Sequence, residues 1–175
     1  MTKIIDLKKH VPTFPGFPKE GINFYDVTGL FRDPDIFAIT NNEMTRLIST
    51  YQPTRLFAID SKGFIFASPV AHRLGIGLSL IRKKSKLPGN PVSYKYELEY
   101  GFDEIEARAM DFDIGDRIVI IDDVLATGGT LAAAVALIQQ LKGNVVGAVT
   151  AMELLNLKGR DKLKIPFSAM LAYES

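Results

Sequence analysis

Residues 118–131, IVIIDDVLATGGTL, contain the side chains and glycines best suited to chemistry. Four β-branched apolar residues indicate a buried strand, and an Ala-rich run beginning near Leu131 is typical of a helix. Glycines between them allow a tight turn, so successive N–H groups can converge on an anion at the positive end of the helix dipole. The predicted phosphate site consists of Ala126, Thr127, Gly128, Gly129 and Thr130, with the two threonine hydroxyls as further donors.

Asp122 and Asp123, which precede this loop, need a different partner, because carboxylates repel phosphate. They suit ribose hydroxyls, or a Mg²⁺ ion held through water. A Walker A loop is excluded, since Gly129 is followed by Thr130 and Leu131 and not by Lys-Ser/Thr. A Gly-Gly pair alone also occurs in structural strand-to-helix turns. The whole order predicts a phosphate cradle beside a sugar or metal site.

Two further turns carry cations or glycine. Arg82, Lys83, Lys84 and Lys86 follow an expected strand at residues 78–81, and Asp60-Ser61-Lys62-Gly63 joins an expected strand to an expected helix. A basic turn can be merely solvated, and it can also indicate a nucleic-acid patch. Since the net charge is near zero, we favour a pyrophosphate, whose negative charges need such a cluster.

The pattern of elements predicts an α/β fold, with a parallel sheet flanked by helices. Strands expected at residues 55–60, 78–81, 117–121 and 145–152 alternate with helices expected from Pro34, at 64–74 and at 131–141. Residues 88–116 are expected to form a long loop or hairpin. Ligands of such sheets bind at the carboxyl ends of the strands, so Asp60, Arg82 and Asp122 are expected to meet there.

Composition narrows the class of protein. The 175 residues, 47% hydrophobic and 23% charged, are typical of a single globular domain. A formal net charge of +1 predicts neither a nucleic-acid nor a membrane partner. The absence of cysteine excludes disulfide and thiol chemistry, and two histidines make a poor zinc site. With no signal-peptide pattern and no apolar run of spanning length, we expect a cytoplasmic protein.

Several segments together resemble the adenine branch of the type I phosphoribosyltransferases, over nearly the whole chain. DDVLATGGT resembles the phosphoribosyl motif of that family, and IRKKSKLPG its basic segment. YELEYG resembles its catalytic loop, and LNLKGRDKL the stretch after its last core strand. The resemblance implies a type I phosphoribosyltransferase fold with a small hood, from about residues 1–30 and the C-terminal segment, and a flexible loop at about 88–108.

The resemblance also implies a reaction. Adenine and phosphoribosyl pyrophosphate would give AMP and pyrophosphate with Mg²⁺, and the purine-salvage enzyme would be a homodimer. Glu99 and Arg82 would be catalytic, with Tyr100 in the same loop as Glu99. The phosphoribosyl group would bind Asp122, Asp123 and Ala126–Thr130, and adenine would bind Asn23, Phe24 and Tyr25. Pyrophosphate would bind Asp60, Ser61, Lys62, Gly63, Arg82, Lys83 and Lys86. The Asp60–Ser61 peptide would be cis.

Two positions depart from the family pattern. Lys62 stands where the family usually has Arg, so the charge is kept but the bidentate fork is lost. Tyr25 replaces another usual Arg and keeps only the backbone N–H. The alternatives are a phosphoribosyltransferase for hypoxanthine, guanine, xanthine or orotate, a non-catalytic sensor of the same fold, and an aspartyl phosphatase. An aspartyl phosphatase built on Asp122 would need a D-x-D pattern that includes this residue, and the sequence has none there. A site for a 6-oxopurine would often use a lysine from about residues 152–156, and none of these residues is a lysine.

Overall fold

The computed structural model describes residues 5–97 and 101–174. A seven-stranded sheet in the order β5-β6-β4-β3-β7-β8-β9 forms its centre. Its strands are β3 Arg55–Ile59, β4 Gly77–Lys83, β5 Val92–Glu97, β6 Phe102–Ala107, β7 Arg117–Leu125, β8 Asn144–Leu154 and β9 Phe167–Tyr173. Strands β4, β3, β7, β8 and β9 are parallel, and the β5–β6 hairpin joins β4 in antiparallel orientation. The predicted α/β fold is therefore confirmed.

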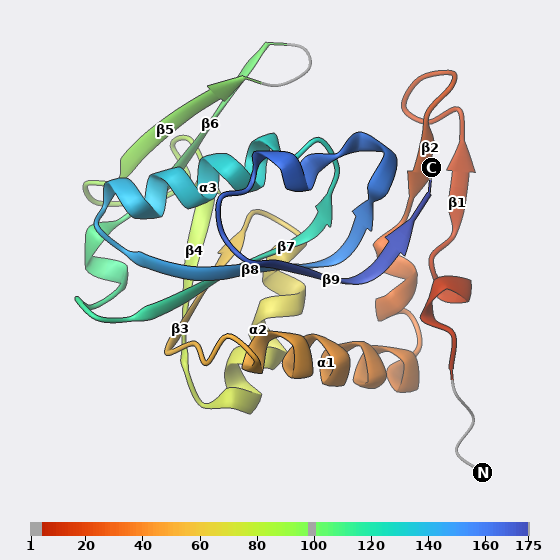
Figure 1. The fold of residues 1–175 in the computed structure, drawn as a ribbon, viewed down its shortest axis with the longest axis horizontal. Helices are drawn as coiled ribbons and strands as arrows, with labels where there is room; N and C mark the ends of the chain where they lie inside the picture. Colours follow the sequence, from red (N-terminus) through yellow and green to blue (C-terminus); the bar gives the residue numbers. More distant parts are fainter. Residues whose placement is uncertain (1–4, 98–100, 175) are drawn as a thin grey trace.

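Helices cover both faces of the sheet (Figure 1). Helices α1 Pro34–Ser49 and α2 Gly63–Leu74 lie on one face, and α3 Gly129–Gln140 lies on the other. Each face has its own apolar cluster, one containing Met44 and Phe66 and the other containing Leu131 and Ile138, all nearly or fully buried. Because both faces of the central strands are buried, their sequences contain continuous runs of apolar residues. In the described part of the chain, no helix has the length and apolar character needed to cross a bilayer.

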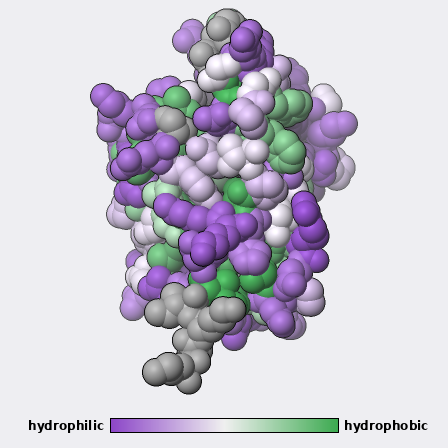
Figure 2. All heavy atoms as spheres, turned by 90° about the vertical axis from the view of Figure 1, so that its right-hand side faces the viewer, coloured by the Kyte–Doolittle hydropathy of each residue, from purple (hydrophilic) through white to green (hydrophobic). Residues whose placement is uncertain are grey.

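The N-terminal region forms a small hairpin beside the end of β9 (Figure 1). Strand β1 Thr13–Pro15 pairs with β2 Asn23–Tyr25, between the 3₁₀ helices Leu7–His10 and Val27–Phe31. The rings of Tyr25 and Tyr173 are 4.5 Å apart and join this hairpin to the C-terminal strand. Polar residues cover much of this face, broken by apolar areas (Figure 2), and Phe14, Phe17 and Ile22 of the hairpin are exposed.

The structure corrects two expectations about the elements and decides between two alternatives for a third segment. Strand β7 continues to Leu125, so Asp122 and Asp123 belong to the strand and not to the loop after it. Of the long loop or hairpin expected at residues 88–116, the structure confirms the hairpin, formed by β5 and β6, and adds a short 3₁₀ helix, Ala109–Asp111. Strand β9 was not expected, nor were the 3₁₀ turns Leu155–Leu157 and Gly159–Lys162 between it and β8. The flexibility expected at residues 88–108 stays a prediction.

Candidate active site

The residues predicted to bind a phosphate form the turn after β7 and the first two residues of α3. We call residues 126–130 the phosphate loop. Gly128 is the residue before α3 and has φ +79°, a backbone conformation that side chains other than glycine rarely adopt. The backbone N–H groups at the start of α3 have no partners within the helix, so this end suits an anion.

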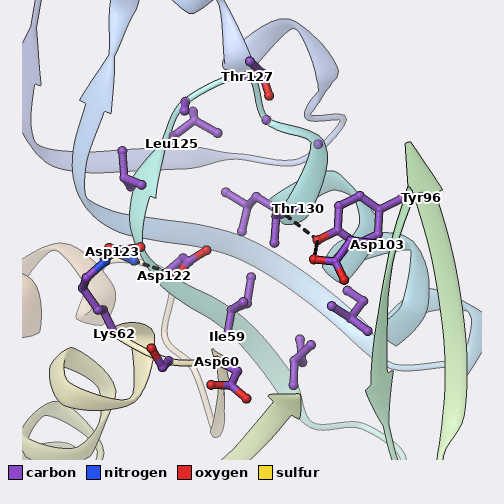
Figure 3. A pocket seen from close by; sticks show the side chains of 18 of the residues that line it. Ile59, Asp60, Lys62, Tyr96, Asp103, Asp122, Asp123, Leu125, Thr127 and Thr130 are labelled. Carbon is purple, nitrogen blue, oxygen red and sulfur yellow. Dashed lines mark hydrogen bonds and ion pairs between the residues drawn. The ribbon is translucent and has the colours of Figure 1, made fainter. Parts of the chain in front are cut away.

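The phosphate loop borders a cavity of about 300 Å³ at the carboxyl ends of the strands (Figure 3). Of the predicted site residues, Asp60, Ser61, Lys62, Lys83, Asp122, Asp123 and Ala126–Thr130 line this cavity. They come from β4 and β7, from the turns that follow β3 and β7, and from the start of α3. The topology therefore brings together the phosphate loop, the two carboxylates and part of the predicted pyrophosphate site.

Asp122 and Asp123 have different surroundings. Asp122 is 8% exposed, and one of its oxygens accepts a hydrogen bond of 2.9 Å from the backbone N–H of Asp123. Burial, together with the negative charge of Asp123, raises the pKa of Asp122 well above its ordinary value. The Asp123 carboxylate forms an ion pair with Lys62, whose Nζ lies 2.9 Å away. Lys62 thus offsets the negative charge of the pair at the edge of an anion site.

Asp60 and Arg82 meet as predicted. Arg82 Nε lies 2.7 Å from a carboxylate oxygen of Asp60, and its guanidinium lies over the ring of Phe64. The Asp60–Ser61 peptide is cis, as expected. Gly63, at the start of α2, packs against β7, where an added Cβ would lie 2.8 Å from the carbonyl oxygen of Ile121. The turn before α2 is therefore held close to Asp122.

The β5–β6 hairpin contributes two side chains, of Tyr96 and Asp103, to which sequence patterns assigned no binding role. Lys83 Nζ lies 2.6 Å from the carboxylate of Asp103, and the Tyr96 hydroxyl lies 3.2 Å from Oγ1 of Thr130. All of these side chains line the cavity. The hydrogen bond with Asp103 raises the pKa of Lys83, so this amine stays charged at neutral pH.

The turn that contains Gly159 packs against the phosphate loop. A Cβ on Gly128 would overlap the carbonyl of Gly159, and a Cβ on Gly159 would overlap the carbonyl of Ala126. Arg160 donates two hydrogen bonds, of 2.6 and 2.7 Å, to the carboxylate of Glu153, which is 3% exposed. The turn in LKGRD therefore packs directly against the loop, a role that sequence patterns alone do not reveal.

The remaining predicted residues lie away from the lining of the cavity or outside the described residues. Asn23, Phe24 and Tyr25 form β2, where the rings of Phe24 and Phe17 pack edge to face at 5.2 Å. Lys86 is exposed in the turn after β4. Glu99 and Tyr100 lie outside the described residues.

Comparisons with known proteins agree with this geometry. The family model of the phosphoribosyl transferase domain matches residues 27–168. An adenine phosphoribosyltransferase of Gluconobacter oxydans is 46% identical over 97% of this chain and 95% of its own length. A Saccharomyces cerevisiae adenine phosphoribosyltransferase, solved with D-2,5-dideoxy-2,5-imino-altritol 1,6-bisphosphate and adenine, superposes with a TM-score of 0.90 at 36% identity, covering 94% of this chain and 96% of that chain.

A more distant structure shares the fold. The adenine phosphoribosyl transferase of Trypanosoma brucei, solved with AMP, pyrophosphate and ribose-5-phosphate, has a TM-score of 0.84 at 25% identity, over 95% of this chain and 77% of that chain. The matched domain, the near-complete coverage and the shared fold all point the same way. The chain belongs to the phosphoribosyltransferase family and, within it, to the adenine phosphoribosyltransferases.

Proposed function

We propose that the protein transfers the 5-phosphoribosyl group from phosphoribosyl pyrophosphate to adenine, which gives AMP and pyrophosphate in purine salvage. One observation carries the proposal: the phosphate loop, Asp122 and Asp123, and the turn Asp60–Gly63 border one cavity or lie against it. A substrate with a phosphate at one end and a pyrophosphate at the other requires two anion sites with a sugar site between them.

Each part of the cavity has a role in this reaction. The phosphate loop binds the 5′-phosphate through backbone N–H groups and threonine hydroxyls. Asp122 and Asp123 accept hydrogen bonds from the ribose hydroxyls. Pyrophosphate binds the backbone of Ser61–Gly63 and the cations Lys62, Arg82, Lys83 and Lys86. Lys62 and Arg82 are each held by a carboxylate in the described structure, which fixes their charges at the edge of the site.

The chemical step builds positive charge on the sugar and negative charge on pyrophosphate. As the C1′–O bond breaks, a ring nitrogen of adenine forms a bond to C1′, and pyrophosphate leaves with the electron pair. The protein orients the two substrates and stabilises the leaving anion with cations already in place. By family resemblance, Glu99 accepts the proton that leaves adenine N7 as the bond to C1′ forms, and a general base of this kind typically contributes about 10²–10⁴-fold to the rate.

The carboxylates of Asp122 and Asp123 suit a Mg²⁺ ion that enters the site bound to the substrate. The described residues contain no group of three or more His, Cys, Asp or Glu side chains that could hold a metal. Mg²⁺ is commonly held by one or two carboxylates together with substrate phosphates and water. Asp122 and Asp123 would hold it through water, and the ion would neutralise charge on pyrophosphate.

Base choice is assigned to β2. Phe24 stacks on the base, and the backbone groups of Asn23 and Tyr25 contact its Watson–Crick edge. A backbone N–H facing N1 matches adenine, where N1 is an acceptor, and clashes with the N1–H of hypoxanthine. Leaving such a buried polar group unpaired can discriminate by about 10⁴-fold.

The test is a measurement of pyrophosphate release with phosphoribosyl pyrophosphate, Mg²⁺ and a panel of bases. We expect adenine to have the highest kcat/KM, and hypoxanthine, guanine, xanthine and orotate to react far more slowly. Equal turnover of hypoxanthine or guanine would contradict the base assignment. An absence of pyrophosphate release with every base would contradict catalysis and favour a sensor.

A further inference from the structure

The Tyr96 hydroxyl lies within hydrogen-bond distance of two side chains that line the cavity with it, Thr130 and Asp103 (Figure 3). Oγ1 of Thr130, in the phosphate loop, is 3.2 Å away, and a carboxylate oxygen of Asp103, on β6, is 3.4 Å away. The same oxygen of Asp103 pairs with Lys83 at 2.6 Å. Tyr96 therefore links the β5–β6 hairpin to a residue assigned to phosphate binding.

The number of protons allows two arrangements. A phenol has one proton to donate, a carboxylate only accepts, and a threonine hydroxyl both donates and accepts. If Tyr96 donates to Asp103, Thr130 donates to Tyr96 and its proton is occupied. If Tyr96 donates to Thr130, the proton of Thr130 is free for an anion in the phosphate loop.

We propose that Tyr96 is a positioning residue that couples occupation of the phosphate loop to the docking of the β5–β6 hairpin. A phosphate in the loop takes the proton of Thr130, and Tyr96 then donates to Thr130. Without a phosphate, the Tyr96 proton is shared between Oγ1 of Thr130 at 3.2 Å and the carboxylate of Asp103 at 3.4 Å. The inference rests on the proposed function, because it requires a phosphate at residues 126–130.

Other features support this coupling. A Cβ on Gly129 would lie 3.5 Å from the carbonyl oxygen of Glu97, so the hairpin backbone already approaches the phosphate loop. Burial raises the pKa of Tyr96, so its hydroxyl keeps its proton at neutral pH and both arrangements stay available. Lys83 offsets the charge of Asp103, which keeps this carboxylate compatible with an anion nearby.

The experiment compares Tyr96→Phe with Tyr94→Phe in the full-length protein. Both tyrosines lie on β5 and pack against the same apolar cluster, but the Tyr94 hydroxyl has no hydrogen-bond partner among the described residues. Ribose 5-phosphate serves as the probe, with affinity measured by titration calorimetry. We expect Tyr96→Phe to weaken binding about 2- to 10-fold, the range of one net hydrogen bond, and Tyr94→Phe to bind like the wild type.

Two readouts separate coupling from a merely structural role. Ribose 5-phosphate should slow hydrogen exchange over residues 92–97 in the wild type and much less in Tyr96→Phe. In a double-mutant cycle, Tyr96→Phe should add little to Thr130→Val, because the valine has already removed the shared hydroxyl. Thr130→Ser keeps the hydroxyl and should keep the coupling.

Two results would overturn the inference while leaving the proposed function intact. The first is that Tyr96→Phe binds ribose 5-phosphate with wild-type affinity and shows the same protection from hydrogen exchange as the wild type. The second is that the effects of Tyr96→Phe and Thr130→Val on this affinity are additive. If the wild type itself does not bind ribose 5-phosphate, the phosphate-loop assignment fails and the coupling fails with it.

Discussion

Gly128 and Gly159 lie in direct backbone contact, although 30 residues separate them in the sequence. Gly128 is the residue before α3, and Gly159 opens a 3₁₀ turn after β8. A Cβ on either residue would overlap a backbone carbonyl of the other segment. The shape of the phosphate loop therefore depends on a turn outside the phosphoribosyl motif.

Gly159→Ala should distort the phosphate loop. The added Cβ would overlap the backbone carbonyl of Ala126, which cannot move aside as the end of a flexible side chain can. We therefore expect the free energy of unfolding to fall by about 1–3 kcal/mol. Binding of ribose 5-phosphate should weaken more than binding of adenine. Chemical denaturation and calorimetry check both effects, with Lys162→Ala, an exposed change in the same turn, as control. Unchanged ribose 5-phosphate affinity would refute the buttressing role.

Arg160→Ala tests the ion pair that anchors this turn. The carboxylate of Glu153 is 4% exposed and would lose two hydrogen bonds, while the arginine side chain is half exposed. We expect a loss of about 1–3 kcal/mol, because a buried charge is left unpaired. The matched control is Arg46→Ala, whose partner Glu43 is 43% exposed, and which should cost less than about 0.5 kcal/mol. Equal losses in the two variants would show that burial of Glu153 does not matter.

The arrangement of the candidate site residues was easier to predict than the contacts that support them. Strand, carboxylates, glycines and helix follow one another locally at residues 118–131, so their order already fixes the phosphate loop and its neighbours. Asp60 and Arg82 were expected to meet because both end parallel strands, and the structure pairs them at 2.7 Å. Alternation of strands and helices was likewise sufficient for the fold class.

The elements that were missed depend on contacts distant in sequence. Strand β9, Phe167–Tyr173, is intermediate in exposure along its whole length, so it lacks the alternation of buried and exposed residues that marks a half-buried strand. The Tyr96–Thr130 and Gly128–Gly159 contacts join separate segments, and no local pattern reports them. The apolar run stops at Ile121, which predicts a loop at the Asp pair, whereas pairing with β8 continues the strand to Leu125.

Asp123→Asn tests the assignment of the acidic pair to the phosphoribosyl substrate. Asparagine keeps the shape but removes the charge, which releases Lys62 from its ion pair and weakens acceptance of a ribose hydroxyl. We expect kcat/KM for phosphoribosyl pyrophosphate to fall about 10- to 100-fold, the range of a charged hydrogen bond, with adenine affinity nearly unchanged. Steady-state kinetics at saturating Mg²⁺ provide the measurement, with exposed Asp161→Asn as control. An unchanged kcat/KM would count against the assignment.

Asp116 should make stability depend on pH in acid. Although burial opposes ionisation, hydrogen bonds from Thr54, the backbone N–H of Asp113 and Arg55 lower the pKa of Asp116 to about 2. The folded pKa lies below the unfolded value near 3.8, so the stabilisation is present above about pH 4 and is lost as the pH falls toward 2. Its size should be on the order of 1–2 kcal/mol.

Urea unfolding between pH 2 and 7 measures this contribution. Asp116→Asn should be less stable than the wild type at pH 7, and the difference should shrink by pH 2. Asp113→Asn is the control, because the Asp113 side chain is 92% exposed and lies 3.8 Å from the same arginine. A difference that stays constant with pH would exclude ionisation of Asp116 as the cause.

Tyr173 offers a test of how β9 supports the proposed base site. Its ring lies 4.5 Å from that of Tyr25, which neighbours the proposed base-stacking residue Phe24, and its hydroxyl is buried without a partner among the described residues. Tyr173→Phe removes only this unsatisfied hydroxyl, so stability should stay the same or rise slightly. Tyr51→Phe is the matched control: its hydroxyl lies 2.7 Å from Oγ of Ser168, and its loss should cost about 1 kcal/mol.

Tyr173→Ala removes the ring itself, so Tyr25 loses its packing partner, and the KM for adenine should rise with little change in the KM for phosphoribosyl pyrophosphate. Thermal unfolding is measured for the two phenylalanine variants, and steady-state kinetics are measured for the alanine variant. Equal destabilisation by Tyr173→Phe and Tyr51→Phe would contradict the assignment of an unsatisfied hydroxyl to Tyr173. An unchanged adenine KM in Tyr173→Ala would show that the C-terminal strand does not support the proposed base site.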